Sequence, residues 1–231
     1  MIWRSKEPPI GKIQRPYCNP YESIWEYQSA FDRGEIDLSF VIEGSCPHCA
    51  RRRCLRRIGS YQRGVIELFP YRVGVVSVAR FMCRKQGRTV LYLPFQLAPY
   101  FRYSVRTIIL ALMLTLELRE EPSLSLWSVV EQLPADCSVT SWLLRSWLWA
   151  LIKALRRSHS TLARLYRLSA LASADSRGES WPELLAYGMV LWRGPPNRKL
   201  AIRRCLLRYS EETSRHFLGT PSQERGALRL A

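Results

Sequence analysis

The order of apolar and polar residues divides the chain into a β-rich first half and a helical second half. After Ile36, short runs rich in β-branched and aromatic residues are separated by turn residues, which predicts strands over 38–42, 65–69, 73–82 and 90–93. Before them, apolar residues at helical spacing predict one short helix over 21–31, with Gly34 as its stop. Residues 1–20 are rich in proline and are expected to form an extended arm.

The second half is predicted to be helical. Residues 94–103 contain two prolines, which remove backbone donors, and form a predicted connector. Ser104, Ser123 and Ser138 are predicted N-caps of three helices. These helices are expected over 105–118, 124–133 and 139–157, and further helices over 160–171, 181–192 and 197–209. The first three, in this order, predict a helix-turn-helix.

Cysteines stand at two of the turns in the β-rich half. Cys46 and Cys49 form a Cys-x2-Cys turn, and Cys83 lies at the tip of a predicted hairpin. A zinc ribbon holds its metal with four such donors, usually from two Cys-x2-Cys turns. The fourth position here is Gln86, a poor zinc ligand, so the fourth ligand stays open, with Cys54 as the nearest spare thiol. Plain buried cysteines without a metal are the alternative.

The expected fold class is therefore α+β, with a small β-rich, zinc-ribbon-like domain followed by an all-α part. The all-α part consists of the helix-turn-helix and the C-terminal helices. The predicted divisions are an arm with a short helix, the ribbon-like domain, the connector, the helix-turn-helix, the C-terminal helices and a tail. They span 1–34, 35–93, 94–103, 104–158, 159–218 and 219–231.

Charge favours a polyanionic partner. Thirty-five Lys and Arg against nineteen Asp and Glu give a net charge of +16. Five arginines follow the first cysteine turn closely: Arg51, Arg52, Arg53, Arg56 and Arg57. Such a run is usually a solvated loop, but its place beside a metal turn makes phosphate contacts a reasonable hypothesis.

The helix predicted over 139–157 is the candidate recognition helix. Its apolar stripe, expected to face the core, consists of Val139, Trp142, Leu143, Ser146, Trp147 and Ala150. On the other face, the expected base contacts are Thr140, Ser141 and Arg145, and the expected phosphate contacts are Lys153, Arg156 and Arg157. The alternative is a core helix of a bundle with solvated charges.

Residues 83–89 read CRKQGRT and residues 93–104 read LPFQLAPYFRYS. With the first cysteine turn, these stretches resemble a bacterial family of uncharacterised function, in which a transposase-type zinc ribbon precedes a helix-turn-helix and which is associated with mobile elements. The similarity spans about residues 35 to 150, and residues 216–223 are also similar. The resemblance implies Zn²⁺ bound by Cys46, Cys49 and Cys83. This chain departs from the family pattern at position 86, where it has Gln86 and the family has cysteine.

The residue content indicates a binding protein and not an enzyme. A transposase catalytic domain holds two metal ions with an acidic triad on a sheet of alternating strands and helices. The chain has only four aspartates, and residues after 104 show no alternating strands. Its three histidines have no cysteine or serine at the spacing of a catalytic pair.

The leading expectation is a DNA-binding protein that resembles the recognition region of a transposase, with double-stranded DNA as its partner. An RNA or ribonucleoprotein ligand is one alternative, and an adaptor role, with a separate recombinase bound through the C-terminal helices, is another. Seven cysteines without a signal segment, and an apolar run over 108–114 that is too short to span a bilayer, favour a cytoplasmic protein without a membrane partner. The DNA site, the oligomeric state and whether zinc is bound stay open.

Overall fold

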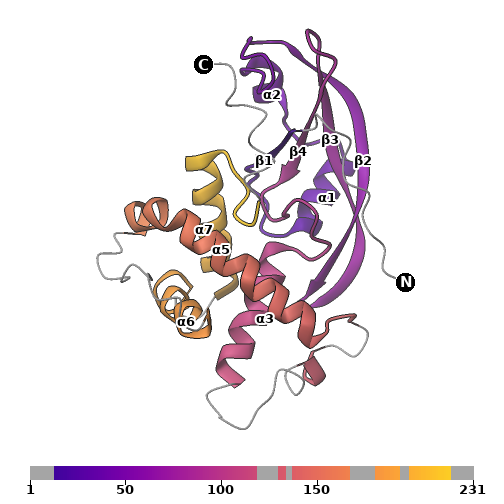
Figure 1. Ribbon diagram of the computed structural model, residues 1–231. Coiled ribbons are helices and arrows are strands. Elements are labelled where there is room, and N and C mark those ends of the chain that lie inside the picture. The colour runs from indigo at the N-terminus through magenta and orange to yellow at the C-terminus, as the bar shows by residue number, and fades with distance from the viewer. Residues whose placement is uncertain (1–12, 119–129, 134–136, 167–179, 193–197, 220–231) are drawn as a thin grey trace.

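The computed structural model describes residues 13–118, 130–133, 137–166, 180–192 and 198–219. These residues contain a four-stranded sheet and six helices, joined by loops. Figure 1 shows the long curved sheet on one side of the molecule and most of the helices on the other. The α+β class predicted from the sequence is therefore confirmed in its coarse form.

The sheet has the strand order β1-β4-β3-β2. Its strands are β1 (Ile13–Tyr17), β2 (Leu55–Leu68), β3 (Tyr71–Cys83) and β4 (Thr89–Pro94). β1 is parallel to β4, and the other neighbours are antiparallel. β2 and β3 form a long hairpin in which Leu55 lies opposite Cys83 at one end and Leu68 opposite Tyr71 at the other. At the usual rise per strand residue, these two ends are roughly 40 Å apart.

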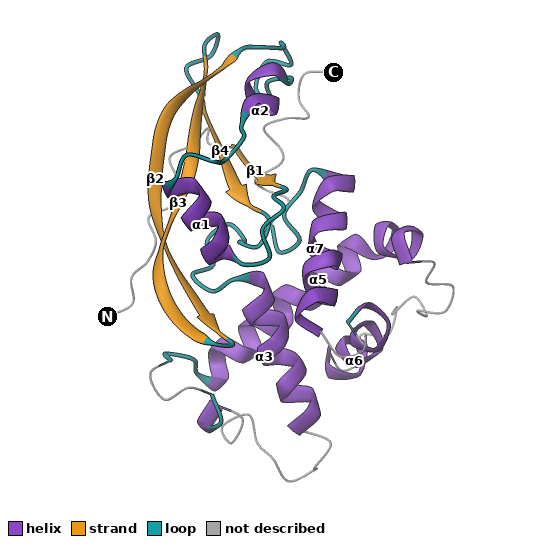
Figure 2. Ribbon diagram, turned by 180° about the vertical axis from the view of Figure 1, so that it is seen from behind, coloured by secondary structure: helices purple, strands orange, loops and turns teal. Residues whose placement is uncertain are grey.

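One helix packs against β3 (Figure 2). In this helix, α1 (Ile24–Asp32), the Ser23 side chain accepts a hydrogen bond from the backbone N–H of Glu26 at 3.1 Å and caps the first turn. The Tyr27 hydroxyl donates to the carbonyl of Ser77 on β3 at 3.0 Å. The short helix predicted over 21–31 is confirmed, and Gly34 ends this segment with a φ of +73°.

The described helices of the second half are α3 (Val105–Leu118), α5 (Ser141–Tyr166), α6 (Ser180–Leu191) and α7 (Arg198–Thr213). Ser104 caps α3, because its hydroxyl accepts the backbone N–H of Thr107 at 3.1 Å. The predicted cap and the predicted bounds of this helix are therefore confirmed. The four helices share one core, in which Trp147 and Trp192 are among the largest fully buried side chains.

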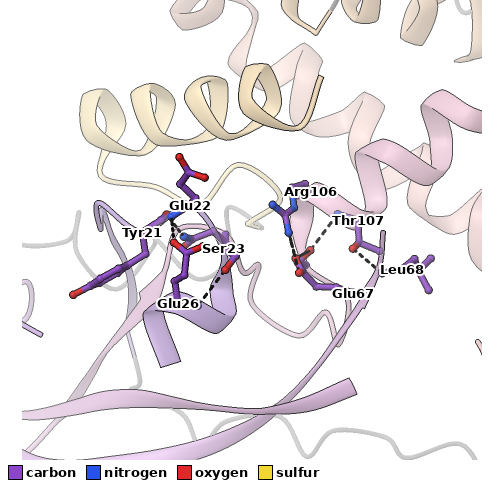
Figure 3. Close-up of polar contacts among 10 residues, drawn as sticks. Tyr21, Glu22, Ser23, Glu26, Glu67, Leu68, Arg106 and Thr107 are labelled. Atoms are coloured by element: carbon purple, nitrogen blue, oxygen red, sulfur yellow. Dashed lines mark hydrogen bonds and ion pairs between the residues drawn. The ribbon is translucent and has the colours of Figure 1, made fainter. Parts of the chain in front are cut away.

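A buried carboxylate connects the sheet to the helices. Glu67 on β2 accepts hydrogen bonds from Arg106 at 2.9 and 2.8 Å and from the Ser104 hydroxyl at 3.0 Å. Figure 3 shows Arg106 of α3 reaching Glu67. Next to this pair, the backbone N–H of Ile66 donates to the carbonyl of Arg102. Because a buried charge is costly without a partner, this contact fixes how the two halves join.

Four expectations for the first half are wrong in detail. The strand predicted over 65–69 is the end of the longer strand β2, which begins at Leu55. Residues 38–42, predicted as a strand, contain the short helix α2 (Ser39–Glu43). Part of the expected arm is strand β1, which buries Ile13 and Tyr17 at the edge of the sheet. The arginine run is not a single loop, since Arg56 and Arg57 already belong to β2.

The candidate recognition helix also differs from the prediction. Its cap is Thr140 and not Ser138, since the Thr140 hydroxyl accepts the backbone N–H of Leu143 at 3.1 Å. The helix continues through Ser160 to Tyr166, so the separate helix predicted to begin at Ser160 is an extension of α5. Its buried stripe is rotated, because Leu144 and Leu148 are buried whereas Trp142, expected in the core, is 74% exposed.

Parts of other predictions lie outside the described residues. These are residues 1–12 of the arm, residues 124–129 of the second predicted helix, the turn residues 134–136, residues 167–171 and 197 of the predicted C-terminal helices, and the tail from 220 onward. In the part of the chain that is described, each helix is too short or too polar to cross a bilayer.

Candidate metal centre

Four cysteine sulfurs meet at one end of the long hairpin. The Sγ atoms of Cys46, Cys49, Cys54 and Cys83 all lie within 4.8 Å of one another. Cys54 Sγ is 3.4 Å from Cys49 Sγ and 3.5 Å from Cys83 Sγ, and Cys83 Sγ is 3.7 Å from Cys49 Sγ. In a tetrahedral site with metal–sulfur bonds of 2.3 Å, the sulfurs are about 3.8 Å apart. The four thiols are therefore placed closely enough to hold one metal ion.

A tight turn holds the first two sulfurs. The backbone N–H of Ala50 donates to the carbonyl of Cys46 at 2.8 Å, and the N–H of Cys46 donates to the carbonyl of Arg51 at 3.0 Å. Ala50 has a φ of 57°, in the left-handed region that such a turn needs directly after its second cysteine. The Cys-x2-Cys segment thus closes on itself and directs both thiols to one side.

The third sulfur comes from the start of β2. Arg53, with a φ of 54°, turns the chain immediately before Cys54. Its backbone N–H donates to the carbonyl of Gly44 at 3.2 Å, and the carbonyl of Cys54 accepts the N–H of Arg84 at 3.1 Å. Cys54 is therefore fixed between the two turns. The ligand left open at the sequence level is a full member of the cluster.

The fourth sulfur lies at the end of β3. The backbone N–H of Gln86 donates to Cys83 Sγ at 3.4 Å, and the N–H of Gly87 donates to the carbonyl of Cys83 at 2.8 Å. Gly87 has a φ of 66°. This turn has the form of a second cysteine turn in which Gln86 contributes a backbone donor, while its side chain is exposed.

Backbone donors and burial set the acidities of these thiols in opposite directions. The backbone N–H of Lys85 lowers the pKa of Cys54 to about 7. Burial raises the pKa of Cys46 to about 12, although the N–H groups of His48 and Cys49 oppose this shift. A buried thiol with a high pKa becomes a thiolate only when a nearby cation compensates its charge. A metal ion in the cluster would therefore favour the thiolate form of Cys46.

His48, which lies inside the first turn, is not part of the cluster. Its Nε2 is 3.2 Å from the carbonyl oxygen of Thr89, on the first residue of β4. Burial lowers the pKa of the His48 ring, which favours its neutral form. His48 therefore ties the first turn to the sheet.

Exposed cations lie close to the cluster cysteines in the sequence. They belong to the two cysteine turns and the start of β2, and we call them the basic ring: Arg51, Arg52, Arg53, Arg56, Arg57, Arg84, Lys85 and Arg88. Among the described residues, none of these eight forms an ion pair. Arg57 lies over the ring of Phe31 at 5.7 Å from its centroid. Arg51, Arg52, Arg53, Arg56 and Arg57 were predicted from the sequence to bind nucleic acid. The other three members of the basic ring were not predicted to do so.

The nucleic-acid contacts predicted on α5 are distributed differently. Thr140 serves as the helix cap. Arg156 forms an ion pair with Glu183, and Arg157 donates to the backbone carbonyls of Phe217 and Gly219. Arg145 and Lys153 are exposed, and Ser141 is half-buried. Internal contacts thus already engage Thr140, Arg156 and Arg157.

Two exposed tryptophans on α5 were not recognised as surface residues. Trp142 and Trp149 are 74% and 52% exposed, and they lie seven residues apart, on one side of the helix. Over the whole helix, both tryptophans lie at helical spacing from the charged residues Arg145, Lys153 and Arg156, which mark the exposed face. The stripe expected over 139–150 did not use this signal.

Comparison of the chain with protein-family models, with curated proteins and with solved structures finds no match. The resemblance seen in residues 83–89 and 93–104 therefore stays an expectation. Inference about function has to start from the site itself, which combines a compact thiol cluster with eight exposed cations.

Proposed function

We propose that this chain is a nucleic-acid-binding protein that contacts the phosphate backbone with its basic ring, and that the cysteine cluster holds a structural Zn²⁺ ion. The basic ring carries the proposal, because eight exposed cations without carboxylate partners repel one another unless a polyanion lies against them. The net charge of +16 acts in the same direction over the whole chain.

Zinc is the metal that suits the donor set. Four thiolates in a closed, partly buried site are typical of structural zinc and leave no open position for substrate. The ion would cross-link the 46–49 turn, Cys54 and the end of β3, and so would hold the neighbouring arginines in a fixed arrangement. Iron also binds four thiolates, and metal analysis of the purified protein separates the two.

Double-stranded DNA is the ligand that we take first, as the resemblance to a transposase recognition region implies. We assign the main contact to the basic ring and not to α5. Thr140, Arg156 and Arg157 make internal contacts that a groove-reading helix would have to break. An additional contact by Arg145 and Lys153 is compatible with the same proposal.

Two double variants with the same change in charge test where the ligand binds. Arg52→Glu with Arg53→Glu alters the basic ring, and Arg145→Glu with Lys153→Glu alters α5, so each lowers the net charge of +16 by four. We expect the first pair to reduce the affinity for a 30-base-pair duplex at least 10-fold. It should also flatten the slope of log K against log salt by about 1.8, or about 0.9 for each lost phosphate contact.

The same measurements also have outcomes that would contradict the proposal. Loss of affinity only with the α5 pair would restore the helix-turn-helix as the interface. Equal small losses with both pairs would indicate a non-specific charge effect, and a wild-type protein that binds neither duplex DNA nor RNA would remove the proposed function. Tight binding to RNA alone would replace DNA as the ligand.

A further inference from the structure

A cleft of about 840 Å³ lies beside the cysteine cluster. Its walls come from the first cysteine turn, from β1 and the residues after it, from α2, from β4 and from the C-terminal end of α7. The side chains that matter here are Arg15, Phe40, Tyr92, Ser210 and Glu211. This volume falls in the range of sites that enclose a small organic group.

An aromatic side chain in this cleft is held in place but is only half covered. Phe40, on α2, stacks on Tyr17 with ring centroids 5.8 Å apart and an interplanar angle of 10°. Tyr92 makes a T-shaped contact with Phe40, with ring centroids 6.0 Å apart and an interplanar angle of 87°. Phe40 nevertheless stays 49% exposed. A fixed, half-exposed ring is a platform on which another flat ring can stack.

Polar groups stand around this platform. The Arg15 guanidinium uses one nitrogen to donate to the carbonyl of Ser214 at 3.2 Å and has further N–H groups to offer. Glu211, on α7, is exposed. The hydroxyl of Ser210 is buried and has no hydrogen-bond partner among the described residues. The cleft therefore combines a stacking surface, a cation and both kinds of hydrogen-bonding group.

The cleft adjoins the start of the basic ring along the chain. Residues 46–50 form one of its walls, and Arg51 follows directly. A strand of nucleic acid whose phosphates lie on the arginines would therefore pass the mouth of the cleft. A paired base cannot enter, because its edge and both faces are occupied in a duplex. An unpaired base has a free face and free edges.

We propose that this cleft binds one unpaired base of the nucleic acid, stacked on Phe40, with Arg15 on a phosphate. The proposal rests on the proposed function, since the basic ring must first hold the backbone. A nucleic acid that fills the cleft must then be a single strand, or a duplex that ends in a single strand. Duplex DNA then binds through the backbone alone.

Three probes of equal length separate base binding from backbone binding: a 12-nucleotide oligothymidine, the same sugar–phosphate chain with abasic sites, and a 12-base-pair duplex. Affinities are measured by fluorescence anisotropy on wild type, Phe40→Leu, Phe40→Trp and Ile42→Ala. Leucine keeps an apolar side chain but has no aromatic face. Ile42 is exposed on the same short helix and is not part of the cleft, so its variant controls for damage to α2.

Wild type should bind the oligothymidine at least 10-fold more tightly than the abasic chain. Phe40→Leu should weaken oligothymidine binding by about 5- to 100-fold, as expected for the loss of one stacked base. Its affinities for the abasic chain and the duplex should not change. Phe40→Trp and Ile42→Ala should bind all three probes as wild type does.

Failure of this proposal and failure of the proposed function give different results. If Phe40→Leu binds all probes as wild type, or weakens all of them equally, the cleft takes no base while backbone binding stands. A wild type that does not distinguish oligothymidine from the abasic chain leads to the same conclusion. Absence of binding to every probe would overturn the proposed function and the cleft proposal together.

Discussion

Cys54 Sγ lies 3.5 Å from Cys83 Sγ, although 29 residues and most of the long hairpin separate them in the sequence. The pairing of Leu55 with Cys83 explains this proximity, because it brings the start of β2 next to the end of β3. The cluster is therefore a consequence of strand register: a shift of β2 by one residue would turn its side chains to the other face.

We predict that Cys54 and not Gln86 completes the metal site. Cys54→Ser should lower the metal affinity at least 10-fold, whereas Gln86→Ala should retain one metal per chain, because Gln86 contributes only a backbone N–H. Metal content after dialysis against a mild chelator checks this prediction. Cys18→Ser, at a thiol outside the cluster, is the control and should also retain the metal. Metal loss in Gln86→Ala but not in Cys54→Ser would contradict the assignment.

Close approach of α1 to β3 leads to a prediction about stability. A Cβ atom on Gly74 would lie 2.8 Å from the Trp25 ring, which also carries Arg72 over its face at 4.5 Å. Gly74→Ala should therefore lower the free energy of unfolding by about 1–3 kcal/mol. Gly64→Ala, where a Cβ meets no atom within 4 Å, should not destabilise the protein.

A double variant isolates the steric cause. In a Trp25→Ala background the ring is absent, so Gly74→Ala should lower the free energy of unfolding much less than it does in wild type. Urea denaturation of the four proteins in this cycle gives the coupling. Equal costs of Gly74→Ala in both backgrounds would show that the ring is not the obstacle.

Two tryptophans on α5 test which face of this helix is buried. Trp147 is 1% exposed and contacts Tyr103 with ring centroids 4.8 Å apart, whereas Trp142 is mostly exposed. Trp147→Ala should reduce the free energy of unfolding by about 3–5 kcal/mol. Trp142→Ala should change it by no more than about 0.5 kcal/mol. Similar losses in both variants would support the stripe expected from the sequence instead.

The contrast between α3 and α5 shows what sequence patterns can and cannot predict. The bounds of α3 follow from local signals, namely the Ser104 cap and an apolar run. In α5, the stripe expected over 139–150 is rotated, because the charged residues that mark the exposed face, such as Lys153 and Arg156, lie mainly beyond residue 150. The opposite face packs against α3, α6 and α7. Non-local structure decides the metal site, since three of its ligands follow from spacing and turns, while Cys54 requires the strand register.

Short segments were ambiguous for a different reason. Residues 38–42 alternate weakly and have too few residues to distinguish a strand from one turn of helix. The strand β1 contains Pro16, which weakens the strand signal, yet an edge strand tolerates proline because one side of its backbone has no sheet partner. Tertiary pairing with β4 therefore determined a structure that the local sequence did not.

His216 is predicted to make stability depend on pH. Burial, with the Arg63 guanidinium nearby, lowers the pKa of this histidine to about 3. The unfolded chain, with a pKa near 6.5, binds a proton that the folded protein does not bind between these two values. Stabilisation by the neutral ring is therefore complete above pH 6.5 and is lost as the pH falls towards 3. The free energy of unfolding should drop by about 2 kcal/mol between pH 7 and pH 5 from this group alone.

Comparison with His216→Met separates this effect from the titration of carboxylates. Methionine is apolar, flexible and of similar volume, so the variant should fold and should lack the histidine contribution to the pH dependence. Urea unfolding at pH 7, 6 and 5 should therefore give a difference between wild type and variant that changes by about 2 kcal/mol over this range. Parallel curves for the two proteins would mean that His216 gains its proton equally in the folded and unfolded states, and that the buried ring is accessible to protons without unfolding.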